Sequence, residues 1–231
     1  MTGASQGIGK AILCNLARTR HFAIGLSRRK PEDLDDSMWR GLDLAKIADV
    51  TRCTSTLEST PVRALVLCAV DYGVGQRHPA ATTSAEEWQR VINTNCVGHC
   101  ILVSRLLPKL VANSPGIIIN LSSDVALLPG AGRSAYAASK AGLHAMLRAV
   151  AAENSADSLR VYQLVPTFQL DTEGIRRRRP ADFDFSSYAD PAIIAEAVNK
   201  ILSAQGSLPV PGTYLLRRDG TLDPHHETTQ I

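Results

Sequence analysis

Short apolar runs alternate along this sequence with stretches of helical periodicity. Several runs are apolar at consecutive positions, which is typical of parallel strands covered on both faces. The expected strands are residues 22–26, 40–44, 62–69, 116–121, 159–165 and 214–216, and the expected helices are 7–19, 45–57, 85–112, 135–154 and 191–203. This alternation predicts an α/β fold with a doubly wound parallel sheet. Such sheets bind ligands at the carboxyl ends of their strands.

The length of the chain suits one domain of this kind. Its 231 residues are 45% hydrophobic, which is enough for a sizeable core, and no repeat or linker divides them. We therefore expect a single domain over 1–231, ending in a polar tail at 221–231. Five scattered cysteines and six histidines without ligand spacing indicate reduced thiols and no metal site.

Charge and hydropathy argue against several classes of protein. The net charge is +3, from 25 basic and 22 acidic residues, which is weak for a nucleic-acid-binding chain. No run approaches the about 18 apolar residues of a membrane span, and the first residues lack the pattern of a signal peptide. We expect a cytoplasmic protein without nucleic-acid or membrane partners. The basic run 176–179 is either a solvated segment or a surface that attracts an anionic substrate or partner.

A glycine-rich turn opens the chain and leads into the first expected helix. Gly3, Gly7 and Gly9 have the spacing G-x-x-x-G-x-G. Glycine permits a tight turn and lets backbone approach a pyrophosphate, toward which the amides at the helix N-terminus point. The motif therefore predicts a dinucleotide site.

The residues after the next two strands indicate which dinucleotide. Ser27 and Arg28 follow the strand at 22–26, where a carboxylate would accept a hydrogen bond from a ribose 2′-hydroxyl. Arg28 can instead pair with a 2′-phosphate, with Ser27 as a neutral donor, so the sequence favours NADP(H). Asp43, near the end of the strand at 40–44, can accept from an adenine amino group.

Four polar residues are candidates for catalysis. Tyr136 and Lys140 share a helix face, and an ammonium beside a phenol lowers its pKa, so that the phenol exchanges a proton with an alcohol or carbonyl. Ser123 follows the strand at 116–121, at the expected ligand edge, and can polarise a carbonyl. Asn95 is polar within an apolar helical stretch, which is equally typical of a buried structural amide.

These motifs together resemble the short-chain dehydrogenase/reductase family. TGASQGIG at 2–9, NTN at 93–95, NLSS at 120–123, YAASK at 136–140 and VPT at 165–167 occur in the family's order. The resemblance implies a Rossmann-like fold, with Tyr136 as general acid/base and Lys140 tuning its pKa and binding the nicotinamide ribose. It further implies that Ser123 orients the substrate carbonyl and that Asn95 holds a water linked to Lys140. The expected cofactor contacts are Gly3, Ser5, Gln6, Gly7, Ile8, Gly9, Ser27, Arg28, Asp43, Tyr136, Lys140, Pro166 and Thr167.

The chain departs from the family pattern at several places. The family has N-N-A-G where this chain has LCAV at 67–70, and glycine where it has the bulkier, β-branched Thr167. The segment expected to cover the substrate, 168–190, has an unusual composition. The family also begins with a central apolar strand, whereas only Met1 precedes Thr2 here. A wrongly chosen start or truncation, a replacement strand and a degenerate protein are the competing explanations, and we favour the first.

The leading functional hypothesis is NADPH-dependent reduction of a ketone or aldehyde, with hydride from the nicotinamide and a proton from Tyr136. One alternative is a catalytically impaired nucleotide-binding or regulatory relative. Another is an NAD-dependent alcohol dehydrogenase. The resemblance also implies a homodimer or homotetramer, packed through the helices at 85–112 and 135–154.

Overall fold

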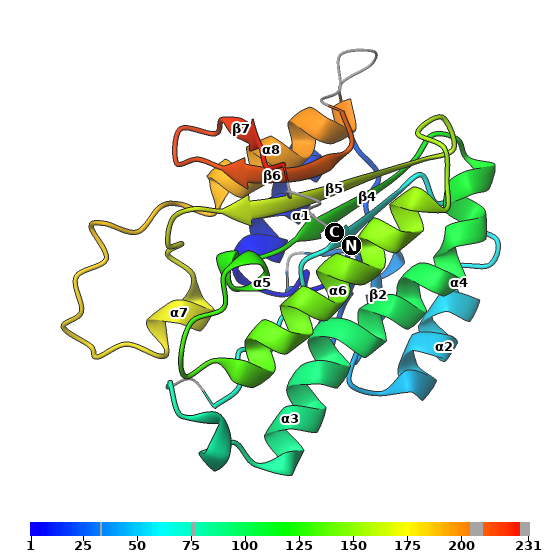
Figure 1. The fold of residues 1–231 in the computed structure, drawn as a ribbon. Coiled ribbons are helices and arrows are strands. Elements are labelled where there is room, and N and C mark those ends of the chain that lie inside the picture. Colours follow the sequence, from blue (N-terminus) through cyan, green and yellow to red (C-terminus); the bar gives the residue numbers. More distant parts are fainter. Residues whose placement is uncertain (33, 75–76, 204–209, 227–231) are drawn as a thin grey trace.

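A parallel sheet runs through the middle of the computed structural model, between two layers of helices (Figure 1). The structure describes residues 1–32, 34–74, 77–203 and 210–226. Within these residues, strands β3 to β7 pair in sequence order, and β1 and β2 form a separate parallel pair. The predicted α/β class, doubly wound sheet and single domain are confirmed.

Each expected strand has a counterpart in the structure, and the strand at 116–121 has the expected bounds. The strands are β1 Gly25–Ser27, β2 Trp39–Gly41, β3 Ala64–Leu67, β4 Gly116–Leu121, β5 Leu159–Pro166, β6 Gly212–Leu216 and β7 Leu222–Pro224. The continuous apolar runs arise because successive side chains point to opposite faces of the sheet. Ile119 packs in one core cluster and its neighbour Ile118 in the other, and both are fully buried.

Strand β7 corrects the expectation of a polar tail at 221–231. It pairs antiparallel with β6 after a tight turn, in which Gly220 has φ 85° and the Thr221 amide donates to Asp219 Oδ1 at 2.9 Å. Leu222 packs against the main core, and the strand is also held by its pairing with β6. Such a short strand has too little pattern to be predicted. Residues 227–231 of the expected tail lie outside the described residues.

Each expected helix has a counterpart in the structure, and two short helices, Asp124–Leu127 and Glu173–Arg176, were not predicted. The helices are α1 Gly7–Arg18, α2 Ile47–Ser55, α3 Ala85–Ile92, α4 Gly98–Ala112, α5 Asp124–Leu127, α6 Ser134–Ala152, α7 Glu173–Arg176 and α8 Ala192–Ser203, with short 3₁₀ turns at Asp36–Met38 and Ala80–Thr82. Helices α1 and α8 pack together on one face, and α2, α4 and α6 cover the other (Figure 1).

The helix expected over 85–112 is interrupted by a π-helical turn, Asn93–Val97, between α3 and α4. The expectation of one uninterrupted α-helix is therefore wrong. π-helical turns are uncommon and occur often at functional sites. Here the turn contains Asn95, whose side chain is buried.

The residues at the start of the chain lie between the two parts of the sheet. The Thr2 amide donates to Val66 O at 2.9 Å, and the Gly3 amide donates to Leu26 O at 2.9 Å. Thr2 thus bridges β1 and β3, at the place where the family's first strand was expected. This position puts the glycine-rich turn at the carboxyl ends of the neighbouring strands.

Candidate functional site

A cleft of about 160 Å³ lies at the carboxyl ends of β1, β2 and β3. Its lining includes the predicted residues Gly3, Ser5, Gln6, Gly7, Ile8, Gly9, Ser27, Arg28 and Asp43. Two glycines are required by space: a Cβ on Gly3 would lie 2.8 Å from Ala69 backbone, and one on Gly9 would lie 2.0 Å from Gly3 O. The turn is therefore packed as closely as a dinucleotide-binding turn must be, and the residues that line the cleft are of the kinds that bind such a cofactor.

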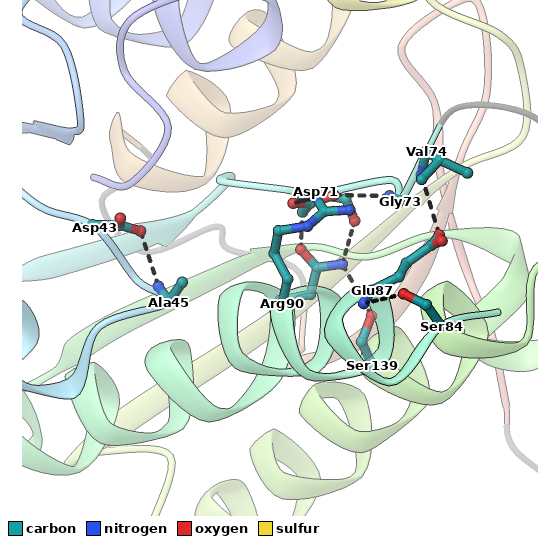
Figure 2. Close-up of polar contacts among 10 residues, drawn as sticks. Asp43, Ala45, Asp71, Gly73, Val74, Ser84, Glu87, Arg90 and Ser139 are labelled. Atoms are coloured by element: carbon teal, nitrogen blue, oxygen red, sulfur yellow. Dashed lines mark hydrogen bonds and ion pairs between the residues drawn. The ribbon is translucent and has the colours of Figure 1, made fainter.

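Three polar residues at the strand tips differ in how they are held. Ser27 accepts a hydrogen bond from Trp39 Nε1 at 3.1 Å and donates to Arg29 O at 2.6 Å. Asp43 Oδ1 accepts from the Ala45 amide at 3.1 Å, which begins the turn into α2 (Figure 2). Arg28 is exposed, and no carboxylate among the described residues forms an ion pair with it. Arg28 is thus a cation that an anionic ligand can approach.

The short helix α7 lies against the glycine-rich turn. Glu173 Oε2 accepts from the Gly7 amide at 2.9 Å, and Arg177 Nη2 donates to Gln6 Oε1 at 2.7 Å. The Gly7 amide, which was expected to face phosphate, therefore already donates a hydrogen bond to a carboxylate oxygen. Sequence reasoning missed this contact because 166 residues separate its partners.

Tyr136 lies on the first turns of α6 and lines a second cavity, of about 490 Å³. Burial raises the pKa of the Tyr136 phenol well above its usual value, and Tyr72 adds to the rise. The Ser123 hydroxyl and the positive charge of Arg133 act in the opposite direction. Ser123 itself donates to Asp124 Oδ1 at 2.7 Å. Tyr136 is therefore protonated near neutral pH and has a proton to give.

Lys140 lies one turn after Tyr136, fully enclosed beside the end of β4. Its Nζ donates to Leu121 O at 2.8 Å. Burial lowers the pKa of Lys140 to about 8, and the Cys68 thiol opposes this change. The groups that lower the pKa of Tyr136 here are Ser123 and Arg133. The expected influence of Lys140 on the phenol stays a prediction.

Asn95 fastens the segment after β3 to α6. Its Oδ1 accepts from the Asp71 amide at 2.7 Å, and its Nδ2 donates to Asp71 O at 2.7 Å and Ser139 Oγ at 3.0 Å. The Asp71 side chain forms an ion pair with Arg90, and Ser139 lies on the opposite side of this cluster (Figure 2). These contacts agree with a buried structural amide. A role in holding water remains an expectation.

Sequence reasoning also missed Tyr72. Its ring lies 5.2 Å from the ring of Tyr136, between centroids, and the Arg178 guanidinium lies 4.1 Å from the centroid of Tyr72. Tyr72 and Arg178 line both the cleft and the second cavity, so the two spaces adjoin. The available signal was the position of an aromatic residue shortly after a strand that ends at the ligand edge.

Pro166 and Thr167 lie at the end of β5, but neither is among the lining residues of the two cavities. The amide and hydroxyl of Thr167 both donate to Leu216 O, at 3.0 and 3.1 Å. Thr167 thus joins the ends of β5 and β6. Its hydroxyl, which the family's glycine lacks, has a structural role here. The place of these residues beside a nicotinamide stays a prediction.

Comparison with known proteins identifies the family. The profile described as short chain dehydrogenase matches residues 1–182. The chain belongs to this family and is an oxidoreductase of the NAD(P)-dependent short-chain dehydrogenase/reductase type. Within the described residues, none of the helices has the length and apolar character needed to cross a bilayer.

Individual relatives agree with this assignment. The chain is 27% identical to the 3-oxoacyl-[acyl-carrier-protein] reductase FabG of Rickettsia felis, over 90% of this chain and 89% of the relative. It is 28% identical to carbonyl reductase family member 4 of Danio rerio, over 87% and 89%. It is also 32% identical to glycine betaine reductase ATRR of Emericella nidulans, over 72% of this chain, but spans only 14% of that protein.

Solved structures have the same fold. An alcohol dehydrogenase from Thermococcus sibiricus, complexed with 5-hydroxy-NADP, matches with a TM-score of 0.78 and 24% identity over 98% of this chain and 97% of the other. A 3-ketoacyl-(acyl-carrier-protein) reductase from Brucella melitensis, complexed with NADH, also has a TM-score of 0.78, at 22% identity over 93% and 94%. Nicotinamide dinucleotides of both kinds thus occur in proteins of this fold.

Proposed function

We propose that the protein reduces a ketone or aldehyde carbonyl to an alcohol, with NADP(H) as its cofactor. One observation carries this proposal: Tyr136 lines a cavity that adjoins the cleft of the glycine-rich turn, with Tyr72 and Arg178 shared between them. The proposed proton donor and the proposed cofactor cleft would therefore meet at one edge of the sheet. Bound NADPH would supply the hydride.

The cofactor would be held by the predicted set of residues. The amides of the turn around Gly7 would bind the pyrophosphate once Glu173 yields its hydrogen bond. Arg28 would pair with the 2′-phosphate, and Ser27 and Asp43 would contact the adenosine. Lys140 would bind the nicotinamide ribose, with Pro166 and Thr167 beside the ring.

The chain's own groups would then complete the reduction. Tyr136 gives its phenol proton to the carbonyl oxygen as that atom gains negative charge. Ser123 holds the same oxygen, for which its hydroxyl must leave Asp124 Oδ1. The ammonium of Lys140 stabilises the phenolate that remains. The segment 168–190 covers the substrate, in keeping with Arg178 and Arg179 in the cavity lining.

Replacement of Tyr136 by phenylalanine tests the central assignment. We expect Tyr136→Phe to lower kcat by about 10²–10⁴-fold, the usual contribution of a general acid, because the hydroxyl is the proton donor. NADPH affinity, measured by fluorescence titration, should change little. Tyr214→Phe is the matched control, because the Tyr214 hydroxyl donates to Val210 O and Tyr214 lines neither the cavity nor the cleft. Near-normal turnover in Tyr136→Phe would refute the assigned role.

A relative that binds nucleotide without turnover is the second candidate. The sequence LCAV at 67–70, where the family has N-N-A-G, favours it, because the asparagine contacts of the family are missing there. Titration with NADPH, followed by a panel of carbonyl substrates, separates the two candidates. Binding without reduction of any substrate would support the second one.

Assembly and location belong to the same proposal. We place the contacts of a homodimer or homotetramer on α3, α4 and α6, and the protein in the cytoplasm. Sedimentation velocity measures the assembly state, and a monomer at micromolar concentration would contradict the first part. Fractionation of cells tests the second part.

A further inference from the structure

The cavity in front of Tyr136 has an unusual charge. Four arginines line it: Arg77, Arg133, Arg178 and Arg179. The one carboxylate among its lining residues, Glu87, is already engaged. Glu87 Oε1 accepts from the Val74 amide at 3.1 Å, and its Oε2 lies 3.4 Å from His78 Nε2 (Figure 2 shows the contact with Val74). The positive charge of the lining is therefore much larger than its negative charge.

Two arginines near the cavity in the sequence pair with carboxylates, whereas the arginines that line the cavity do not. Arg90 forms an ion pair with Asp71, and Arg176 forms one with Asp171 at 2.5 Å. Within the part of the chain that the structure describes, no carboxylate forms an ion pair with any of the four lining arginines. The chain thus has acidic partners for neighbouring arginines and leaves this group available to a ligand.

Aromatic rings, rather than carboxylates, hold two of these arginines. The Arg178 guanidinium lies over Tyr72, and Tyr72 lies against Tyr136. Arg179 lies 5.2 Å from the centroid of Phe183 and donates to the Tyr188 hydroxyl at 3.2 Å. Stacking uses the face of a guanidinium and leaves N–H donors in its plane for an anion. Arg178 is therefore both positioned and able to bind.

The cofactor does not account for this group of charges. Arg178 also lines the cofactor cleft, but Arg77, Arg133 and Arg179 line only the cavity in front of Tyr136. Arg28, at the tip of β1, is the residue proposed to bind the 2′-phosphate, and it does not line the cavity of Tyr136. The anion that these three arginines would neutralise must therefore belong to the molecule that occupies the substrate cavity.

We propose that the carbonyl substrate carries an anionic group, a carboxylate or a phosphate, which Arg178 and the neighbouring arginines bind while the carbonyl lies at Tyr136. The inference rests on the proposed reductase function and names its substrate class. Arginine suits both anions because its paired N–H donors match two oxygens of either group. A cavity of about 490 Å³ accommodates a small oxo acid or oxo phosphate ester.

Matched pairs of carbonyl compounds test the charge requirement. We would compare kcat/KM, with NADPH, for 4-oxopentanoate and its methyl ester, and for dihydroxyacetone phosphate and dihydroxyacetone. We expect the charged member of at least one pair to be favoured about tenfold or more, the equivalent of one hydrogen bond to a charged group. The pair that responds distinguishes a carboxylate from a phosphate. Equal kcat/KM within both pairs would overturn the proposal.

Substitution of the arginines then locates the anion. Arg178→Gln and Arg133→Gln should lower the preference for the charged over the neutral member about tenfold, whereas Arg178→Lys should restore part of it. The ratio of the two substrates cancels any effect on Tyr136 itself or on the cofactor. Arg18→Gln, on the last turn of α1, is the control and should leave the ratio unchanged. An unchanged ratio in both cavity variants would refute the assignment, with circular dichroism reporting their folding.

A binding measurement separates this inference from the proposed function. Calorimetry measures the affinity of the same four compounds for the complex of the protein with NADPH. If no compound is reduced but the anions bind and Arg178→Gln abolishes that binding, the reductase function fails and the anion site stands. If neutral carbonyls are reduced and the anions neither bind nor react, the function stands and the anion site fails.

Discussion

At the scale of single residues, Arg28 determines the expected choice between NADPH and NADH. It is exposed at the tip of β1 and lines the cofactor cleft. Arg28→Asp removes the cation and places a carboxylate where the 2′-phosphate would lie. We expect the ratio of the two dissociation constants to shift toward NADH by about 10–100-fold, because a hydrogen bond to a charged group is lost and repulsion is added.

Fluorescence titrations with both cofactors measure that shift. Arg29→Asp is the matched control, because Arg29 is the next residue, is equally exposed and is absent from the cleft lining. An unchanged cofactor ratio in Arg28→Asp would mean that the cofactor assignment is wrong. An equal shift in both variants would indicate a general effect of charge.

The site residues that the sequence predicted are all recognised from residues close to them in the sequence. The glycine-rich turn is recognised from its own spacing, and Tyr136 with Lys140 from one helix face. Tyr72 and Glu173, in contrast, lie next to predicted site residues only because the chain folds. Tyr72 meets Tyr136 across 64 positions of the sequence, and Glu173 meets Gly7 across 166. No local pattern encodes such contacts, so these two residues required the structure.

At the scale of secondary-structure elements, α7 lies against the glycine-rich turn and forms hydrogen bonds with it. Its Glu173 carboxylate accepts from the Gly7 amide and lies where the phosphates of the cofactor are expected. Glu173→Gln keeps an oxygen acceptor but removes the negative charge. We expect NADPH to bind about threefold more tightly, which corresponds to roughly 0.5–1 kcal/mol of relieved repulsion near a helix N-terminus.

Titration at low and high salt measures this effect, which should shrink as salt screens the charges. Glu196→Gln, on the exposed side of α8, removes the same charge at a distance and should leave NADPH affinity unchanged. Weaker binding in Glu173→Gln would contradict the expectation. It would show that the carboxylate shapes the turn for the cofactor.

The sequence predicted the secondary-structure elements whose burial produces a clear apolar pattern. It did not predict an element that exists because it pairs with a neighbouring strand. Strands β4 and β5 lie between two helical layers, and their long apolar runs follow from that position. Strand β7 exists because it pairs with β6. The π-helical turn Asn93–Val97 interrupts a predicted helix, and its Asn95 contacts Asp71 and Ser139, which lie far from it in the sequence.

At the scale of the whole molecule, a buried histidine joins the parts of the sheet to the helical layer. His99 Nε2 lies 3.1 Å from Thr2 Oγ1, and its Nδ1 lies 3.2 Å from Asn95 O. The Thr2 hydroxyl oxygen also accepts from the amides of Cys68 and Ala69, so its proton is directed to His99. We therefore assign His99 as the neutral tautomer with the proton on Nδ1.

This arrangement predicts how stability depends on pH. Burial lowers the pKa of His99 to about 4, although its hydrogen bond to Asn95 O opposes the change. The unfolded chain takes up the proton near pH 6.5, so it binds more protons than the folded chain between about pH 6.5 and 4. The contribution of His99 to the free energy of unfolding has its full value above this window. It falls as the pH drops through the window, by about 3 kcal/mol for this group alone.

Urea unfolding at a series of pH values measures the loss. His99→Gln should be less stable than the parent protein at pH 8, because a buried network is broken, but its stability should fall less steeply between pH 6.5 and 4. His21→Gln serves as the matched control, since His21 lies beyond the end of α1 and contacts Ser203. That variant should keep the parent slope. If His99→Gln also keeps it, His99 does not carry the acid sensitivity, and the junction at Thr2 tolerates a charged imidazole.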